Sequence, residues 1–140
     1  MKRQALLILT IFSMIICTNC TQQKTIDYVC YTDKPEEINI ATGDIEAYLL
    51  GYRMVNIPSV SDIKVARSDN GFYLLALEKN EGVTYAIPLE ESDDKLFIEK
   101  SGIIHGCEND AFSLEVFSIV DGEIKACVDC NHRIMKQQEF

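Results

Sequence analysis

Residues 62–89, DIKVARSDNGFYLLALEKNEGVTYAIPL, decide the fold of this chain. At their centre, residues 72–78 (FYLLALE) are almost wholly apolar, which predicts a central, buried strand. Residues 62–67 alternate between polar and apolar side chains and predict a second strand. Asn70-Gly71 lies between the two runs and is a strong hairpin signal, because both residues tolerate a positive φ. The stretch therefore predicts an antiparallel pair of strands.

The same pattern of strands and tight turns continues toward the C-terminus. The Asn-Glu-Gly turn at 80–82 leads to a third predicted strand at 83–89, where Pro88 near the end indicates an edge or an exit from the sheet. Asp121-Gly122 predicts another hairpin. The other strands predicted in this half of the chain are 95–99, 111–120 and 123–128.

Toward the N-terminus we predict one strand and one helix. Residues 25–31 (TIDYVCY) alternate and are rich in strand-forming residues. From Asp44 to Met54 the apolar residues have helical spacing, and Asp44 can cap the first turn. The fold class predicted from all these elements is mainly antiparallel β, α+β, with six or seven hairpin-connected strands and one short N-terminal helix. The apolar face of that helix would consist of Ile45, Tyr48, Leu49 and Tyr52.

The first twenty residues, MKRQALLILTIFSMIICTNC, have the features of a secretory signal. Lys2 and Arg3 form a positive head, and the run from Ala5 to Ile16 is apolar except for Thr10 and Ser13. As a helix this run would reach about 18 Å, short of the roughly 30 Å hydrocarbon core of a membrane. A basic head, a short apolar middle and polar residues after it favour a signal peptide over a stable span.

Cys20 lies four residues past the apolar run, where a bacterial lipoprotein would carry its lipidated cysteine. The residues before it, Cys17-Thr18-Asn19, match the lipoprotein box loosely, and Cys17 is a competing acceptor. No Ala-x-Ala release site is present, so simple secretion and a retained anchor stay open as alternatives. We predict a signal peptide at 1–19, a lipid attachment site and tether at 20–24, a single β-rich domain at 25–132 and a frayed tail at 133–140.

The charge of the exported part is strongly negative. Without residues 1–19, Lys plus Arg falls from 13 to 11 while Asp plus Glu stays at 22, so about 11 net negative charges remain. Such a chain repels phosphates, which disfavours nucleic acid as a partner. An acidic surface would attract a cationic protein, although solubility at a crowded cell surface is the simpler interpretation.

The cysteine count agrees with lipidation at Cys20, because Cys17 then leaves with the signal and four cysteines, an even number, remain besides the lipidated one. In an oxidising compartment four cysteines predict two disulfides, with three connectivities. We predict that Cys107 pairs with Cys127 or Cys130, and that Cys30 takes the one left over. Closing the 107–127 loop would contribute about 3 kcal/mol in the chain-entropy model.

The stretch Cys127-Val128-Asp129-Cys130-Asn131-His132 permits two other interpretations. A Cys-x-x-Cys with a nearby histidine can ligate zinc, and Cys107 or His105 could complete four ligands. Two thiols at this spacing can also reach one another and form a dithiol that is active in thiol–disulfide exchange. However, the pair ends a predicted strand instead of starting a helix, and Cys107 has no close second cysteine. Structural disulfides are therefore favoured, and we predict no metal and no cofactor.

Three short patterns match, in order, those of the penicillin-binding and β-lactamase enzymes. Ser61 and Lys64 of the first pattern fall in a predicted strand, where residues three apart point to opposite faces. The chain is also too short for that two-part fold, so we treat the match as accidental. The patterns are Ser61-x-x-Lys64, Ser68-Asp69-Asn70 and Lys100-Ser101-Gly102.

Other candidate residues for chemistry are few. His105 is predicted at a turn or rim, and His132 falls beside the frayed tail. The acidic turn at 90–94 lacks the glycine of a calcium loop. No nucleophile elbow, phosphate loop or dinucleotide fingerprint is present. We therefore predict no catalytic residues and no enzymatic activity.

The leader, together with hairpins that end in Gly122-x-Ile-x-x-Cys-x-x-Cys130, resembles small exported lipoproteins of Gram-negative bacteria, of the Bacteroidetes type. The resemblance implies a place in the cell envelope, at the periplasm or the outer-membrane surface, with a lipid as membrane anchor. It implies no named activity. We expect a non-enzymatic binding module with a protein partner. The alternative is an inhibitor or immunity protein against a cationic hydrolase such as a lysozyme, since small acidic β-rich lipoproteins perform that role.

Overall fold

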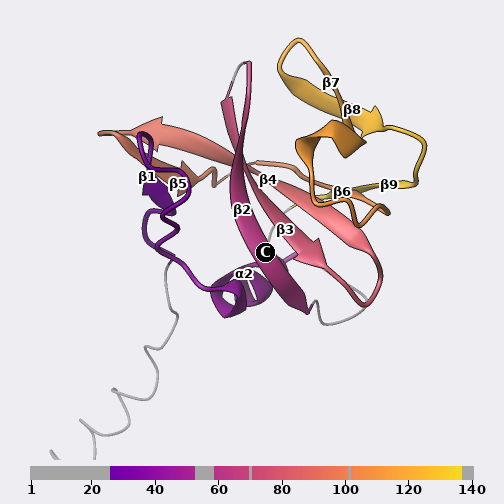
Figure 1. Cartoon of the computed structure of the whole chain (residues 1–140), viewed down its shortest axis with the longest axis horizontal. Helices are drawn as coiled ribbons and strands as arrows, with labels where there is room; N and C mark the ends of the chain where they lie inside the picture. Colours follow the sequence, from indigo (N-terminus) through magenta and orange to yellow (C-terminus); the bar gives the residue numbers. More distant parts are fainter. Residues whose placement is uncertain (1–25, 53–58, 70, 101, 137–140) are drawn as a thin grey trace, which may run out of the picture.

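The structure is a computed structural model that describes residues 26–52, 59–69, 71–100 and 102–136. The predicted signal peptide, Cys20 and the tether lie outside the described residues. Within them the chain is mainly antiparallel β with one α-helix, as predicted (Figure 1). The described elements are β1 (Cys30–Tyr31), α2 (Thr42–Leu49), β2 (Val60–Ser68), β3 (Gly71–Glu78), β4 (Val83–Ser92), β5 (Lys95–Ile98), β6 (Ile104–Cys107), the 3-10 turn η1 (Leu114–Val116), β7 (Phe117–Val120), β8 (Glu123–Cys127) and β9 (His132–Met135).

The main sheet is built around β3 and β4. Its strands run in the order β1-β5-β4-β3-β2, and β6 joins β4 and carries β9 on its other edge. Strand β4 has two partners along one edge, β6 at residues 84–86 and β5 at residues 89–92. Strands β7 and β8 form a separate two-stranded sheet.

Pro88 lies inside β4, not at a strand end as predicted, at the gap between β6 and β5. Its carbonyl oxygen accepts a hydrogen bond from the Glu99 N–H at 3.0 Å. The nitrogen and the oxygen of one strand residue face the same side, so the missing N–H of Pro88 also faces this gap. The proline therefore removes no hydrogen bond between β3 and β4.

Both faces of the central strands are covered, which explains the continuous apolar run at 72–78. Leu74 and Ala76 pack in a core cluster with α2 on one face. Leu75, between them, packs on the other face with residues of η1, β7 and β8. Figure 1 shows α2 and the β7–β8 hairpin in separate places against the sheet. The prediction of a central, buried strand is confirmed.

The helix is shorter than predicted, because α2 spans Thr42–Leu49. Ala41 is the N-cap, and the carboxylate of Asp44 reaches back to accept the Ala41 N–H at 2.9 Å. The chain turns at Gly51, but Tyr52 still packs on the predicted face, since its hydroxyl lies 2.7 Å from that of Tyr48.

Two-residue turns join several strands. Asp121 and Gly122 have φ values of 52° and 78°, as predicted for that hairpin. Asp93 and Asp94 adopt the same positive φ, 51° and 61°, in the acidic turn between β4 and β5. In the first hairpin Ser68 pairs with Gly71, so the loop falls one residue earlier than predicted. Asn70 in that loop lies outside the described residues.

Residues 111–120 do not form the single strand that their alternation predicts. Phe112 has a φ of 52°, and residues 114–116 form the 3-10 turn η1. The side-chain oxygen of Ser113 accepts the Glu115 N–H at 3.2 Å and caps this turn. Strand β7 therefore begins only at Phe117.

Both ends of the predicted domain also differ from expectation. Of the described residues 26–31, only Cys30 and Tyr31 form a strand, β1, which pairs with Leu96 and Lys95 of β5. In the predicted frayed tail, Arg133 to Met135 belong to β9 (His132–Met135), which pairs with all four residues of β6. Backbone pairing with β6 thus orders the tail as far as Met135.

Candidate functional site: a three-cysteine cluster

Three cysteine sulfurs lie together where β6, β8 and the loop after β8 meet. Cys107 ends β6 and Cys127 ends β8, and a disulfide joins them with the Cα atoms 5.7 Å apart. Cys130, three residues later, has a free thiol. All three Sγ atoms lie within 4.8 Å of one another. The structure thus joins Cys107 to one of its two predicted partners and brings the other close.

Cys30 does not form a disulfide with the remaining cysteine, Cys130, contrary to our prediction. It has a free thiol and is fully buried in the core cluster that includes α2. Cys107 belongs to the cluster on the opposite face of the sheet. A disulfide requires Cα atoms about 4.4–6.8 Å apart, so Cys30 and Cys130 cannot meet across the sheet. Burial raises the pKa of the Cys30 thiol, and Glu36 adds to this effect.

The loop that carries Cys130 is hydrogen-bonded on both sides. Before it, the Val128 N–H donates to the Val116 carbonyl at 2.8 Å. After it, the Asn131 carbonyl accepts the Glu108 N–H at 3.0 Å. Asp129 has a φ of 53°, so the Cys-x-x-Cys segment forms a turn and not the start of a helix. These contacts hold the third sulfur beside the disulfide.

The electrostatic surroundings keep Cys130 as a thiol. Burial raises its pKa, and the carboxylates of Asp129 and Glu108 raise it further. A thiolate is the attacking form of cysteine, so at neutral pH this residue is mainly the protonated thiol, which reacts slowly. No cation among the described residues counts among the causes of this shift, whereas a fast redox site typically has positive surroundings.

Two histidines lie on the same strand face as Cys107. His132 is directly opposite Cys107 in the β6–β9 pairing, and His105 lies two residues before it in β6. Their rings are stacked, with an angle of 6° between the two planes. The distance between Nδ1 of His105 and Nε2 of His132 is 2.9 Å. Burial lowers the pKa of His105, and His132 lowers it further. Both residues are therefore in paired strands, not at the rim and beside a frayed end as predicted.

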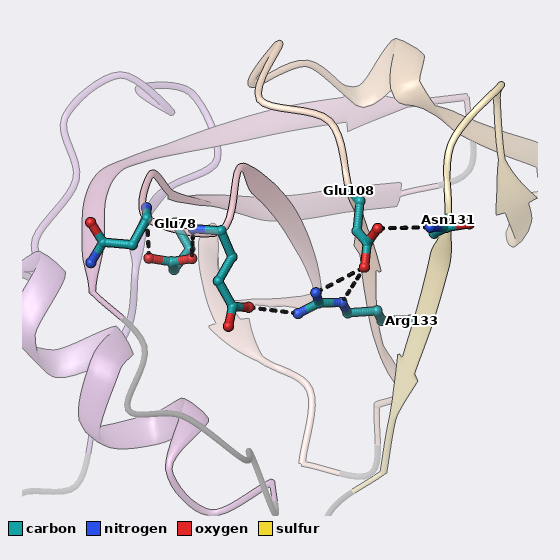
Figure 2. Close-up of polar contacts among 6 residues, drawn as sticks. Glu78, Glu108, Asn131 and Arg133 are labelled. Atoms are coloured by element: carbon teal, nitrogen blue, oxygen red, sulfur yellow. Dashed lines mark hydrogen bonds and ion pairs between the residues drawn. The ribbon is translucent and has the colours of Figure 1, made fainter.

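The opposite face of β9 carries an ion-pair network (Figure 2). Arg133 donates to Glu81 at 2.8 Å and, through two nitrogens, to Glu108 at 2.9 and 3.1 Å. Asn131 also donates to Glu108, and these bonds together lower the pKa of the Glu108 carboxyl. The network joins the β3–β4 turn, the end of β6 and β9.

Sequence reasoning missed both the histidine pair and the Arg133 network. The only signal was the short run His-Arg-Ile-Met at 132–135, whose alternation is too brief to distinguish from a polar tail. The pairing of this run with β6 depends on contacts that no local pattern records.

Ser61, Lys64 and Ser68, which the structure describes, are not brought together as an enzyme of that class would need. Ser61 and Ser68 lie toward opposite ends of β2, so about 23 Å of extended chain separates them. The Ser61 hydroxyl donates to the Leu77 carbonyl, and the Lys64 ammonium lies over the Phe112 ring. Ser101 lies outside the described residues.

Among the described residues, only the three cysteines form a group close enough to hold a metal ion together. The group contains Cys107, Cys127 and Cys130 but not His105, which the zinc interpretation offered as an alternative ligand. With the disulfide formed, two of these sulfurs are bonded to each other, so metal binding would require its reduction.

The acidic residues of the β4–β5 hairpin, Glu90, Glu91, Asp93 and Asp94, are all exposed. They lie at the end of the main sheet that is remote from the cysteine cluster (Figure 1).

Comparison with known proteins finds no family model, curated protein or solved structure that matches this chain. No helix among the described residues has the length and apolar character needed to cross a membrane.

Proposed function

We propose that this chain is an exported lipoprotein that acts as a non-enzymatic interaction module at the cell envelope. The lipid on Cys20 would hold it to the membrane, and the folded part would bind a protein partner. The proposal is supported by the basic head and apolar run of residues 1–20.

The single observation that carries the proposal is the Cys107–Cys127 disulfide. Disulfides persist in the periplasm and at the cell surface and are rare in the cytosol of most organisms. This one crosses from the main sheet to the small sheet, and its 20-residue separation corresponds to about 3 kcal/mol of stability. A fold that relies on such a bond is suited to an oxidising compartment.

Intact mass of the protein recovered from the envelope fraction tests this proposal. We expect a chain that begins at Cys20, carries a lipid and lacks the two hydrogens of one disulfide. Cys20→Ser is the matched control and should lose the lipid. A full-length, reduced chain in the cytosol contradicts the proposal, and cleavage without lipid favours simple secretion.

The alternative function, inhibition of a cationic hydrolase such as a lysozyme, is supported by the acidic β4–β5 hairpin. Four exposed carboxylates at one turn would speed the encounter with a positive enzyme. The test is inhibition of a purified cationic lysozyme at low and high salt. Inhibition that is lost when the hairpin residues Glu90, Glu91, Asp93 and Asp94 are changed to amides favours this function.

A matched control keeps the number of charges removed the same. Changing four exposed acidic residues near the β7–β8 sheet to amides should leave inhibition intact. If the unaltered protein does not inhibit the enzyme, the alternative function is contradicted and the binding module remains the proposal. The control residues are Asp110, Glu115, Asp121 and Glu123.

A further inference from the structure

The cysteine cluster contains more sulfur than a structural disulfide needs. Cys107 and Cys127 are bonded, yet the Cys130 thiol lies within 4.8 Å of both sulfurs. We propose that the three residues form an intramolecular thiol–disulfide exchange site in which Cys130 is the attacking thiol. The inference is independent of the lipid anchor.

Geometry favours the exchange because all three sulfurs are held close before any reaction. The backbone hydrogen bonds of Val128 and Asn131 fix the loop on both sides of Cys130. The attacking sulfur thus needs a side-chain rotation and a local loop adjustment, not an encounter between separate molecules. Such proximity replaces a bimolecular step with a unimolecular one.

The exchange requires no added oxidant or reductant. Cys130 loses its proton to solvent, and its thiolate attacks Cys127 Sγ. The bond between Cys127 and Cys107 breaks, and Cys107 leaves as a thiolate that takes up a proton. One disulfide and one thiol are present before and after. Attack on Cys107 Sγ instead gives a Cys107–Cys130 bond and releases Cys127.

The alternative bonds have different structural consequences. A bond from Cys107 to either Cys127 or Cys130 links β6 of the main sheet to the end of β8. A Cys127–Cys130 bond closes only a four-residue loop and leaves no disulfide between the two sheets. Exchange therefore decides whether a disulfide crosslinks the small sheet to the main sheet.

The rest of the chain supplies an internal control. Cys30 is a free thiol like Cys130, but it is buried on the opposite face of the sheet. It should take no part in the exchange.

Peptide mapping of the full, oxidised chain tests the proposal. The protein is held at alkaline pH without oxidant or reductant, quenched in acid, unfolded and labelled with a maleimide. Trypsin then places Cys107 in peptide 101–125 and the other two cysteines of the cluster in peptide 126–133. Cys17 and Cys20 fall in peptide 4–24, and Cys30 falls in peptide 25–53 because trypsin does not cut between Lys34 and Pro35, so they do not interfere.

We expect the label on Cys107 to rise with time, together with peptide 126–133 closed by its own disulfide. The rise should be at least tenfold over that in Cys130→Ser and unchanged in Cys30→Ser. If the label stays on Cys130 at every time point, the proposal is overturned.

A second variant tests reach directly. In Cys127→Ser, air oxidation should join Cys107 to Cys130, which a crosslink between peptides 101–125 and 126–133 reports. If both thiols remain free in that variant while its circular dichroism is native, the sulfurs do not reach bonding distance and the proposal is overturned. Should Cys127→Ser fail to fold, the mapping of the unaltered chain decides alone.

Discussion

His105 and His132 share one hydrogen bond across two neighbouring strands, with 2.9 Å between Nδ1 of the first and Nε2 of the second. At this distance one nitrogen donates and the other accepts, which requires at least one neutral ring. If both imidazoles were protonated, two donors and two positive charges would face each other in stacked rings. The pair therefore couples the β6–β9 pairing to pH.

We predict that the protein loses stability as the pH falls from about 7.5 to about 5.5, a range that spans the ordinary histidine pKa of about 6.5. Burial and His132 lower the pKa of His105 in the folded chain, so the unfolded chain binds its proton first. The contribution is thus fully present above the unfolded pKa and is lost as the pH falls through the folded one. Urea unfolding at the two pH values measures it.

His105→Gln is the matched variant, because it keeps a polar side chain but removes the titration. Its stability should change less over the same pH range than that of the unaltered protein. Equal losses in both proteins would show that other groups cause the pH dependence.

A second prediction concerns Gly106, which lies between His105 and Cys107 and opposite Tyr85. A Cβ at this position would lie 2.9 Å from Cε1 and 3.0 Å from Cδ1 of the buried Tyr85 ring. Gly106→Ala should therefore cost about 1–3 kcal/mol of unfolding free energy, as expected for overpacking. Chemical denaturation measures the change.

Gly43 offers a control of opposite sign. It lies in α2, and a Cβ there would meet nothing within 4 Å. Because alanine is the better helix former, Gly43→Ala should stabilise the protein by about 0.5–1 kcal/mol. If Gly106→Ala is as stable as the unaltered protein, or more stable, the steric account of Gly106 is wrong.

These examples show which parts of the fold the sequence could predict. The strand at 72–78 was predictable because its residues are apolar on both faces and a hairpin signal precedes it. The Asp121-Gly122 turn was predictable because its geometry requires residues that tolerate a positive φ. Each of these features is decided by residues that are neighbours in the chain.

Features that depend on distant residues were not predictable. Strand β9 exists because β6 offers a free edge, and nothing in residues 132–135 records that edge. Alternation at 111–120 predicted one strand, but the Ser113 side chain stabilises a 3-10 turn inside it. The site also depended on distant residues. The Cys-x-x-Cys spacing was visible in the sequence, but the position of Cys30 on the face of the sheet opposite Cys107 was not.

A third prediction concerns the acidic turn between β4 and β5. Asp93 and Asp94 both have a positive φ, which side-chain-bearing residues adopt at a cost. Asp94→Gly should stabilise the protein by about 0.5–1 kcal/mol, because Asp-Gly suits this turn and one of four clustered negative charges is removed. Thermal or urea unfolding at fixed salt measures the change.

The reverse substitution in a similar turn is the control. Gly122 has a φ of 78°, so Gly122→Ala should destabilise the β7–β8 hairpin by about 1 kcal/mol. A neutral result for both variants would mean that these turns do not store the strain that their φ values indicate.

The last prediction concerns Glu78, a carboxylate that is only 3% exposed at the end of β3. Its two oxygens accept the backbone N–H groups of Asn80 and Glu81, at 2.9 and 2.8 Å (Figure 2). These bonds shape the turn from which Glu81 reaches Arg133. Glu78→Ala leaves both amides without their acceptor and should cost about 1–3 kcal/mol.

Glu78→Gln separates the hydrogen bonds from the charge. Glutamine replaces one of the two accepting oxygens with an NH₂ group, which cannot accept the N–H that faces it, so the loss of stability should lie between those of the unaltered protein and Glu78→Ala. Glu90→Ala, at an exposed position in β4, should change stability by less than about 0.5 kcal/mol. If Glu78→Ala is as mild as Glu90→Ala, the carboxylate does not hold the turn, and the Arg133 network must be positioned by β9 alone.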